Sequence, residues 1–151
     1  MNIVVSACLL GVNCRYCGDH CLQEEILALQ DQYHIIPVCP EVLGGLPTPR
    51  VASEIVGDKV ITKEGQDVTD AFYKGAKETL KIAQSLKADY AILKKNSPSC
   101  GYGQVYDGSF SGQLVAGNGV AAQCLSNANI TIMNELNYKE ILQKEIKINK
   151  K

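Results

Sequence analysis

Three cysteines stand at positions from which they could hold one metal centre. Cys8, Cys39 and Cys100 each come shortly after a short apolar run, in segments that contain glycine or proline. Three thiolates that meet in a reducing compartment are typical ligands of zinc or of an iron–sulfur cluster. A centre with only three protein ligands keeps one metal position open for chemistry. The alternative for each cysteine taken alone is a small buried hydrophobic side chain.

Groups that could act on a bound substrate lie close to these cysteines in the sequence. Glu41 follows Cys39 by two residues, and Ser97 precedes Cys100 by three. Glu41 could act as a base or proton shuttle, and Ser97 as a hydrogen-bond partner. The alternatives are a carboxylate in a helical turn that Pro40 begins, and a serine that shapes a turn.

Positive charge and aromatic rings accompany the same segments. Arg50, Lys94 and Lys95 would favour thiolate over thiol at neighbouring cysteines. The glycine-rich segment 101–112 carries three aromatic residues, and it could close over a planar ligand and stack on it.

The first loop carries a second group of cysteines. Cys14 and Cys17 form a Cys-x-x-Cys pair, which Cys21 follows. Such a pair could bind a metal or act as a redox couple. No second pair at a matching spacing follows, so a zinc finger is not supported, and we interpret all three as loop cysteines. Cys124 lies among small residues of an expected helix and is interpreted as a core residue.

Strands and helices that alternate along the chain must position these side chains. Apolar and β-branched runs predict strands at 2–6, 34–38, 90–93 and 130–133. Apolar periodicity predicts helices over 22–32, from 67 or 69 to about 86, over 119–128 and over 138–146. The segment 53–62 is expected to form a hairpin and 94–117 a long loop without regular structure. Residues 149–151 are expected to fray.

This alternation predicts a single α/β domain that spans residues 1–151. We expect a three-layer, Rossmann-like architecture, with a mostly parallel sheet, helices on both faces and a small hairpin insertion. Ligands of such sheets sit beyond the carboxyl ends of the strands. Cys8 lies two residues past the first strand, Cys39 directly past the second, and Cys100 in the loop after the third. Parallel neighbouring strands would therefore bring the three sulfur atoms to one edge of the sheet.

Composition narrows the classes of partner. The 151 residues are 46% hydrophobic and 21% charged, which is ordinary for a globular domain. The net charge of −1 gives no argument for a nucleic-acid or membrane-surface partner. No apolar run is long enough to span a bilayer, and the N-terminus lacks the regions of a signal peptide. We therefore expect a cytoplasmic protein whose seven cysteines stay reduced.

Three stretches are informative as a set. They are Ser6-Ala7-Cys8-Leu9-Leu10-Gly11 with Cys14-Arg15-Tyr16, then Cys39-Pro40-Glu41-Val42-Leu43-Gly44-Gly45-Leu46-Pro47-Thr48-Pro49-Arg50, and then Lys94-x-x-Ser97-Pro98-Ser99-Cys100-Gly101. Together they resemble the YbbK-like family, a domain of unknown function that includes the thiouracil desulfidases. The resemblance covers essentially the whole chain. One departure is Cys17, which stands where the family pattern has an aspartate.

The resemblance implies a 4Fe-4S cluster with three cysteine ligands, an acid–base residue and a residue that positions the substrate. In this chain these positions are Cys8, Cys39, Cys100, Glu41 and Ser97. The further substrate contacts that we expect are Arg50, Lys94 and Ser99.

The implied reaction removes sulfur from a thiolated pyrimidine, such as 2- or 4-thiouracil or its nucleotide. The fourth iron takes the sulfur, water replaces it, and hydrogen sulfide leaves. The expected partner is thus a small molecule rather than nucleic acid or membrane, and the sequence leaves a homodimer open. Protein purified in air could lack the cluster or carry zinc. The alternatives are a non-enzymatic zinc or iron–sulfur protein that stores or senses metal, and a thiol oxidoreductase built on Cys14 and Cys17.

Overall fold

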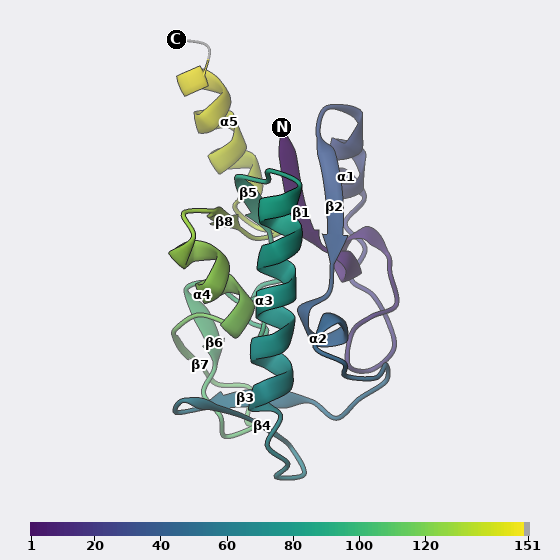
Figure 1. Ribbon diagram of the computed structural model, residues 1–151, viewed down its shortest axis with the longest axis vertical. Coiled ribbons are helices and arrows are strands. Elements are labelled where there is room, and N and C mark those ends of the chain that lie inside the picture. The colour runs from purple at the N-terminus through teal and green to yellow at the C-terminus, as the bar shows by residue number, and fades with distance from the viewer. Residues whose placement is uncertain (150–151) are drawn as a thin grey trace.

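A four-stranded parallel sheet lies at the centre of the computed structural model, which describes residues 1–149 (Figure 1). Its strands are β1 (Asn2–Ser6), β2 (His34–Val38), β5 (Tyr90–Ile92) and β8 (Thr131–Met133). They are arranged in the order β2-β1-β5-β8, and every pairing between them is parallel. The four strands predicted from apolar runs are confirmed.

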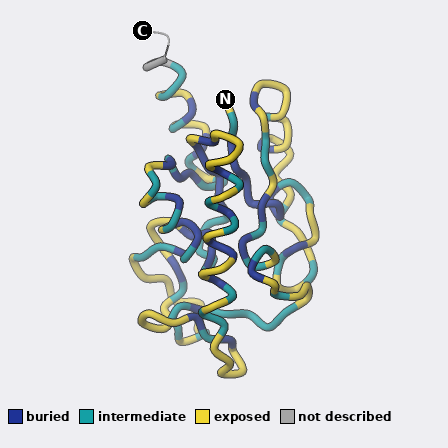
Figure 2. Tube along the Cα trace, in the orientation of Figure 1, coloured by how far each residue is buried: buried dark blue, intermediate teal, exposed yellow. Residues whose placement is uncertain are grey.

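Two core clusters, one on each face of the sheet, make the fold three-layered. The β1 side chains alternate between them, with Val4 in one cluster and Ile3 and Val5 in the other. Val4 shares its cluster with residues of α3 (Thr69–Ser85) and α4 (Val120–Asn127), and Ile3 and Val5 with residues of α1 (Glu24–Leu27) and α5 (Tyr138–Asn149). Figure 2 shows these buried segments running through the middle of the molecule. Within residues 1–149, no helix combines the length and apolar character needed to cross a membrane.

Two antiparallel hairpins lie beyond the end of the sheet to which the β2 arrow points (Figure 1). The first, β3 (Ser53–Val56) with β4 (Lys59–Thr62), confirms the hairpin expected at 53–62. The second consists of β6 (Gln104–Tyr106) and β7 (Leu114–Ala116). It lies within residues 94–117, so the prediction that this segment is a loop without regular structure was wrong. Its strands are three residues each and β7 is exposed throughout, so no apolar pattern marks the hairpin.

The first helix is also less regular than its apolar face predicts. Instead of one helix over 22–32, a single α-helical turn, α1, is followed by the 3-10 helix η2 (Ala28–Asp31). Of these residues only Ile26 is buried, so little packing holds the segment in one continuous helix. At the other end of the chain, Asn149 is the last residue of α5 rather than part of a frayed tail. Lys150 and Lys151 lie outside the described residues.

The short helix α2 (Pro40–Leu43) packs directly against α3, and two glycines allow this contact. A Cβ atom on Gly75 of α3 would lie 1.8 Å from the carbonyl oxygen of Pro40. A Cβ atom on Gly44 would lie 2.0 Å from the carbonyl oxygen of Ala71. Because α2 begins directly after Cys39 and carries Glu41, the close approach of the two backbones fixes the position of both residues.

Replacement of Gly75 with alanine is expected to push α2 away from α3. Alanine normally stabilises a helix relative to glycine by about 1 kcal/mol. Here the clash with the α2 backbone should reverse the sign and lower the free energy of unfolding by about 1–3 kcal/mol. Urea unfolding measures this change, with Gln84→Ala on the exposed side of α3 as the control. A Gly75→Ala protein as stable as the unmodified one would contradict the tight α2–α3 contact.

Candidate metal centre and substrate pocket

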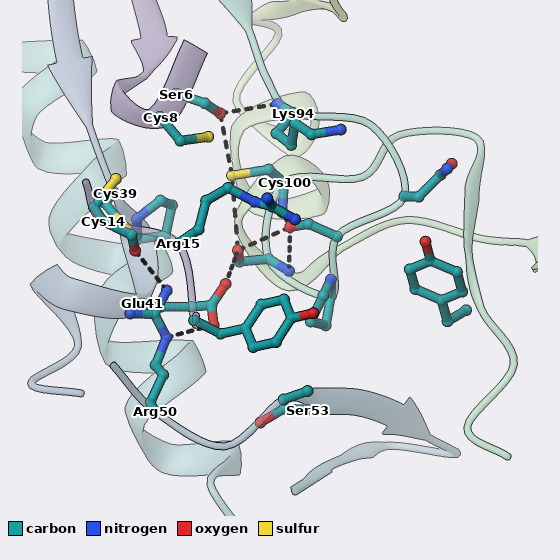
Figure 3. Close-up of a pocket in the computed structure, with 18 of the residues that line it drawn as sticks. Ser6, Cys8, Cys14, Arg15, Cys39, Glu41, Arg50, Ser53, Lys94 and Cys100 are labelled. Carbon is teal, nitrogen blue, oxygen red and sulfur yellow. Dashed lines mark hydrogen bonds and ion pairs between the residues drawn. The ribbon is translucent and has the colours of Figure 1, made fainter. Parts of the chain in front are cut away.

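One pocket of about 460 Å³ opens at the carboxyl ends of β1, β2 and β5 (Figure 3). Cys8 reaches it from the 3-10 helix η1 (Ala7–Leu10), which follows β1 directly. Cys39 reaches it from the junction of β2 and α2, and Cys100 from the loop after β5. The structure therefore brings together, in one pocket, the three cysteines that the sequence places after three separate strands.

The strand order explains this convergence. β1 lies between β2 and β5, so the chain leaves β1 on one side for β2 and later returns on the other side for β5. The loops that follow neighbouring strands then diverge, and the space between them is the usual ligand site of an open α/β sheet. Register agrees, because Ser6 pairs with Val38 at the ends of β1 and β2, just before Cys8 and Cys39.

Cys14 is a fourth thiol of this pocket, so its interpretation as a loop cysteine outside the site was wrong. Cys14 is 8% exposed, and its side chain lies beside those of Cys39 and Cys8. The Cys39 thiol also lies 3.7 Å from the Cys14 carbonyl oxygen, to which it donates. Its spacing from Cys17 gives no hint of this position, since the pattern treats the two as a pair. The available signal is its place in the first motif, close to Cys8.

The pKa values of the Cys14, Cys39 and Cys100 thiols are raised, which favours their protonated forms when no metal is bound. Burial raises the pKa of the Cys100 thiol to about 11, against the opposing hydrogen bonds of Ser6 and Ser99. The hydrogen bond with Cys39 lowers the pKa of Cys14, but the bond with Cys8 and burial outweigh it and raise the pKa to about 11. The bond with Cys14, together with burial, raises the pKa of Cys39 far above its usual range. Metal ligation by these side chains must therefore release protons.

A hydrogen-bonded network fixes Glu41 at the pocket (Figure 3). The Arg50 Nε donates to Glu41 Oε1 at 3.1 Å, and the Ser99 hydroxyl donates to Glu41 Oε2 at 2.9 Å. Another Arg50 nitrogen donates to the Cys14 carbonyl oxygen at 2.9 Å. Ser97 extends the network, since its Oγ lies 3.1 Å from Ser99 Oγ. Both carboxylate oxygens are thus oriented by the protein, and one edge of the network touches the cysteine loop.

The loop that carries Cys100 is held from two sides. The Cys100 amide donates to Ser97 Oγ at 2.7 Å, and the Ser6 hydroxyl lies 3.4 Å from Cys100 Sγ, to which it donates. The Lys94 amide donates to Ser6 Oγ at 2.9 Å, and Lys94 Nζ pairs with Glu135 at 2.8 Å. Ser6, at the end of β1, is therefore also a residue of this site, although it was not among the predicted site residues.

The three expected substrate contacts, Arg50, Lys94 and Ser99, all line the pocket but are engaged with protein partners. Arg50 has only 6% of its side chain exposed, and Ser99 is 2% exposed. Their contacts make them supports of Glu41 and of the Cys100 loop, and direct contact with a substrate stays a prediction for all three.

The remaining cysteines lie outside this pocket lining. Cys17 is exposed and its thiol donates to Asp19 at 2.8 Å, while Cys21 and Cys124 are half-buried. Cys124 lies on α4. A redox couple of Cys14 and Cys17 would have to join a buried thiol to an exposed one that faces Asp19.

The donor set of the pocket is soft: four thiols, three of them from separate strand ends. Within residues 1–149, no group of three or more His, Cys, Asp or Glu side chains is arranged to hold a metal ion. The four thiols line one shared pocket. A polynuclear cluster spreads its thiolate ligands over several iron atoms, so it matches thiols that stand around a cavity.

A model of the 2-thiouracil desulfurase family matches residues 3–137. The chain belongs to the 2-thiouracil desulfurase family. Among its relatives is the uncharacterized protein YbbK of Bacillus subtilis (strain 168). It is 42% identical over an alignment of 150 residues, which covers 93% of this chain and 99% of the relative. The resemblance to the YbbK-like family is thereby confirmed.

A solved structure of a 2-thiouracil desulfurase relative also matches. The 4Fe-4S-dependent thiouracil desulfidase TudS resembles this chain with a TM-score of 0.89 at 39% identity. The match covers 95% of this chain and 96% of TudS. The α/β architecture expected from the sequence is confirmed by this likeness along nearly the whole length of both proteins.

Proposed function

We propose that this protein is a 4Fe-4S-dependent desulfidase that hydrolyses a thiolated pyrimidine, either 2- or 4-thiouracil or its nucleotide. Thiouracil and water would give uracil and hydrogen sulfide. Both protons of hydrogen sulfide come from the water and no electron is gained or lost, so the reaction is not a redox reaction. The observation that carries the proposal is the shared pocket of Cys8, Cys39, Cys100 and Glu41. Family membership and the cofactor named for TudS support it.

The residues present fit such a cluster. Cys8 and Cys100 are buried and Cys39 is half-buried, and all three line a cavity large enough to admit a ligand beside them. When bound, a cluster with three protein thiolates would supply an iron position that acts as a Lewis acid towards a soft thiocarbonyl sulfur. We assign the ligand role to these three residues, and Cys14 remains as a neighbouring thiol.

Glu41 is the residue that we assign to water activation. A water molecule that attacks the ring carbon must lose a proton, and a carboxylate at the pocket can accept it. The donors Arg50 and Ser99 hold the two carboxylate oxygens in fixed directions, which keeps the base aimed at one position. This arrangement also separates the base from bulk water, because both the Glu41 and the Arg50 side chains are mostly buried.

Ser97→Ala is expected to slow turnover by a smaller factor than a change at Glu41. The Ser97 hydroxyl accepts a hydrogen bond from the Cys100 amide and contacts Ser99 Oγ. Loss of this hydroxyl should therefore loosen the loop that carries Cys100 and the orientation of Glu41. One lost hydrogen bond corresponds to a reduction of about five- to tenfold. Steady-state uracil release measures it, with Ser85→Ala at the exposed end of α3 as control. A rate unchanged by Ser97→Ala would remove Ser97 from substrate positioning.

Anaerobic reconstitution with iron and sulfide tests the whole proposal. The loaded protein should show the broad visible absorption of an iron–sulfur cluster and should release uracil from thiouracil in a single turnover. Equal amounts of uracil and hydrogen sulfide are required by the balance of the reaction. A protein that takes up the cluster but releases no uracil from either thiouracil isomer or its nucleotide would instead be a metal-binding protein.

A further inference from the structure

The side of the pocket formed by the two hairpins contains chemistry that the proposed mechanism does not use. Ser53 and Glu54 of β3, Tyr106 of β6, and Phe110 and Gly112 of the β6–β7 loop line the cavity. Figure 3 shows Ser53 below Glu41, with Cys8 and Cys100 above Glu41. The hairpins therefore face the cysteine end of the pocket across the space in which a ligand would lie.

Glu54 joins the two hairpins by an unusual contact. Its side chain is buried, with the residue only 8% exposed, and its Oε1 accepts two backbone amides of the β6–β7 loop. The amide of Gly108 donates at 3.0 Å and that of Phe110 at 3.1 Å. A buried carboxylate that accepts two amides holds a loop firmly, because these charge-assisted bonds form where water is excluded.

The loop adopts a demanding conformation at Phe110. Its φ of 57° lies in the left-handed region, where a bulky side chain is rare. The neighbouring Gly108 approaches β3 so closely that a Cβ there would lie 2.8 Å from the Ile55 carbonyl oxygen. Phe110 is nevertheless only half-buried and lines the pocket, as Tyr106 does. The surrounding structure therefore fixes an aromatic ring at the cavity without covering it completely.

We propose that Phe110 and Tyr106 form the stacking surface for the pyrimidine ring, and that Glu54 is the positioning residue that holds Phe110 in the pocket wall. The inference rests on the proposed function, and it names the part of the site that selects a planar ring. Aromatic side chains stack on nucleobases through their π-faces and accept every base that offers one. The aromatic wall formed by Phe110 and Tyr106 would thus select a planar ring, while the thiol end of the pocket would select sulfur.

The role of the aromatic wall is tested by measuring the binding of uracil to the cluster-loaded protein by calorimetry. Uracil has the pyrimidine ring but no sulfur. Phe110→Leu keeps apolar volume and removes the aromatic face, so the dissociation constant of uracil and the KM for thiouracil should rise about five- to 150-fold. The kcat should stay within about twofold, since the ring holds the substrate equally before and during the reaction. Phe110→Tyr should restore binding. Tyr102→Leu, an exposed aromatic outside the pocket lining, is the matched control.

Glu54 is tested through a double-mutant cycle on uracil binding. Glu54→Ala should weaken binding about as much as Phe110→Leu, whereas Glu54→Gln keeps an acceptor oxygen and should weaken it much less. Because Glu54 acts through Phe110, the variant that carries both Glu54→Ala and Phe110→Leu should bind no more weakly than Phe110→Leu alone. Additive losses would mean that Glu54 supports the fold and not the stacking residue.

Two outcomes separate this inference from the proposed function. If the loaded protein releases no uracil from thiouracil, the desulfidase proposal fails, and uracil calorimetry still reports on the wall. If turnover is observed but Phe110→Leu leaves both the dissociation constant of uracil and the KM unchanged, the wall is not a stacking surface and the inference is overturned.

Discussion

Glu41→Gln is expected to lower the single-turnover rate of uracil release about a hundredfold or more while the cluster stays in place. Glutamine has the shape of glutamate and an oxygen that can still accept from Arg50, but its amide cannot take a proton from water. General-base assistance is typically worth a factor of about a hundred to ten thousand, which sets the expected loss. The measurement is rapid-quench release of uracil from thiouracil by the reconstituted variant.

The matched control for this change is Glu140→Gln, an exposed glutamate in the first turn of α5. Thiouracil binding by Glu41→Gln should stay close to that of the unmodified protein, because the change targets proton transfer and not ring contacts. Uracil release at the unmodified rate, with the visible spectrum of the cluster intact, would exclude Glu41 as the base.

Cys100→Ser should prevent cluster assembly, and Cys8→Ser and Cys39→Ser should do the same. A serine hydroxyl nearly matches the thiol in shape, but it is a hard oxygen donor that iron–sulfur clusters accept poorly. Mutation of a residue that merely hydrogen-bonds to a metal ligand typically lowers metal affinity about 10–100-fold. Loss of a ligand itself should therefore reduce the bound iron at least about tenfold. Iron and acid-labile sulfide per chain, measured after anaerobic reconstitution, give the result.

Two further variants locate the cluster among the seven cysteines. Cys17→Ser combined with Cys21→Ser is the matched control and should keep full iron content, since Cys17 is exposed and neither residue lines the pocket. Cys14→Ser tests whether Cys14 is also a ligand, because Cys14 lies beside two of the assigned ligands. Retained iron in Cys14→Ser confirms a three-cysteine centre, and equal loss in Cys14→Ser and Cys100→Ser would contradict it.

The strand-end cysteines show how far local pattern reaches. Cys8, Cys39 and Cys100 are separated by up to 92 residues, yet each follows an apolar run whose strand character is visible in the sequence. Parallel sheets place all carboxyl ends on one edge, so the shared pocket follows from strand assignment alone. Glu41 and Ser97 could be predicted from the sequence as well, because each is close along the chain to one of these cysteines.

The hairpin with β6 and β7 shows where local pattern fails. Its three-residue strands carry no periodicity, and the contact that orders its loop comes from Glu54, more than fifty residues earlier. Nothing around Glu54 in the sequence distinguishes it from a surface carboxylate in a hairpin. Its burial exists only once two hairpins from distant parts of the chain meet.

The sequence by itself determined the four core strands, the layered α/β fold, and the three strand-end cysteines and the carboxylate that line the pocket. These features depend on apolar periodicity and on residues near strand ends, which a few neighbouring positions encode. Only the tertiary structure decided that Cys14 joins the pocket, that Arg50 is committed to Glu41, and that Glu54 holds the loop of Phe110. Those assignments depend on which side chain meets which backbone across tens of residues, and packing of the whole chain fixes that.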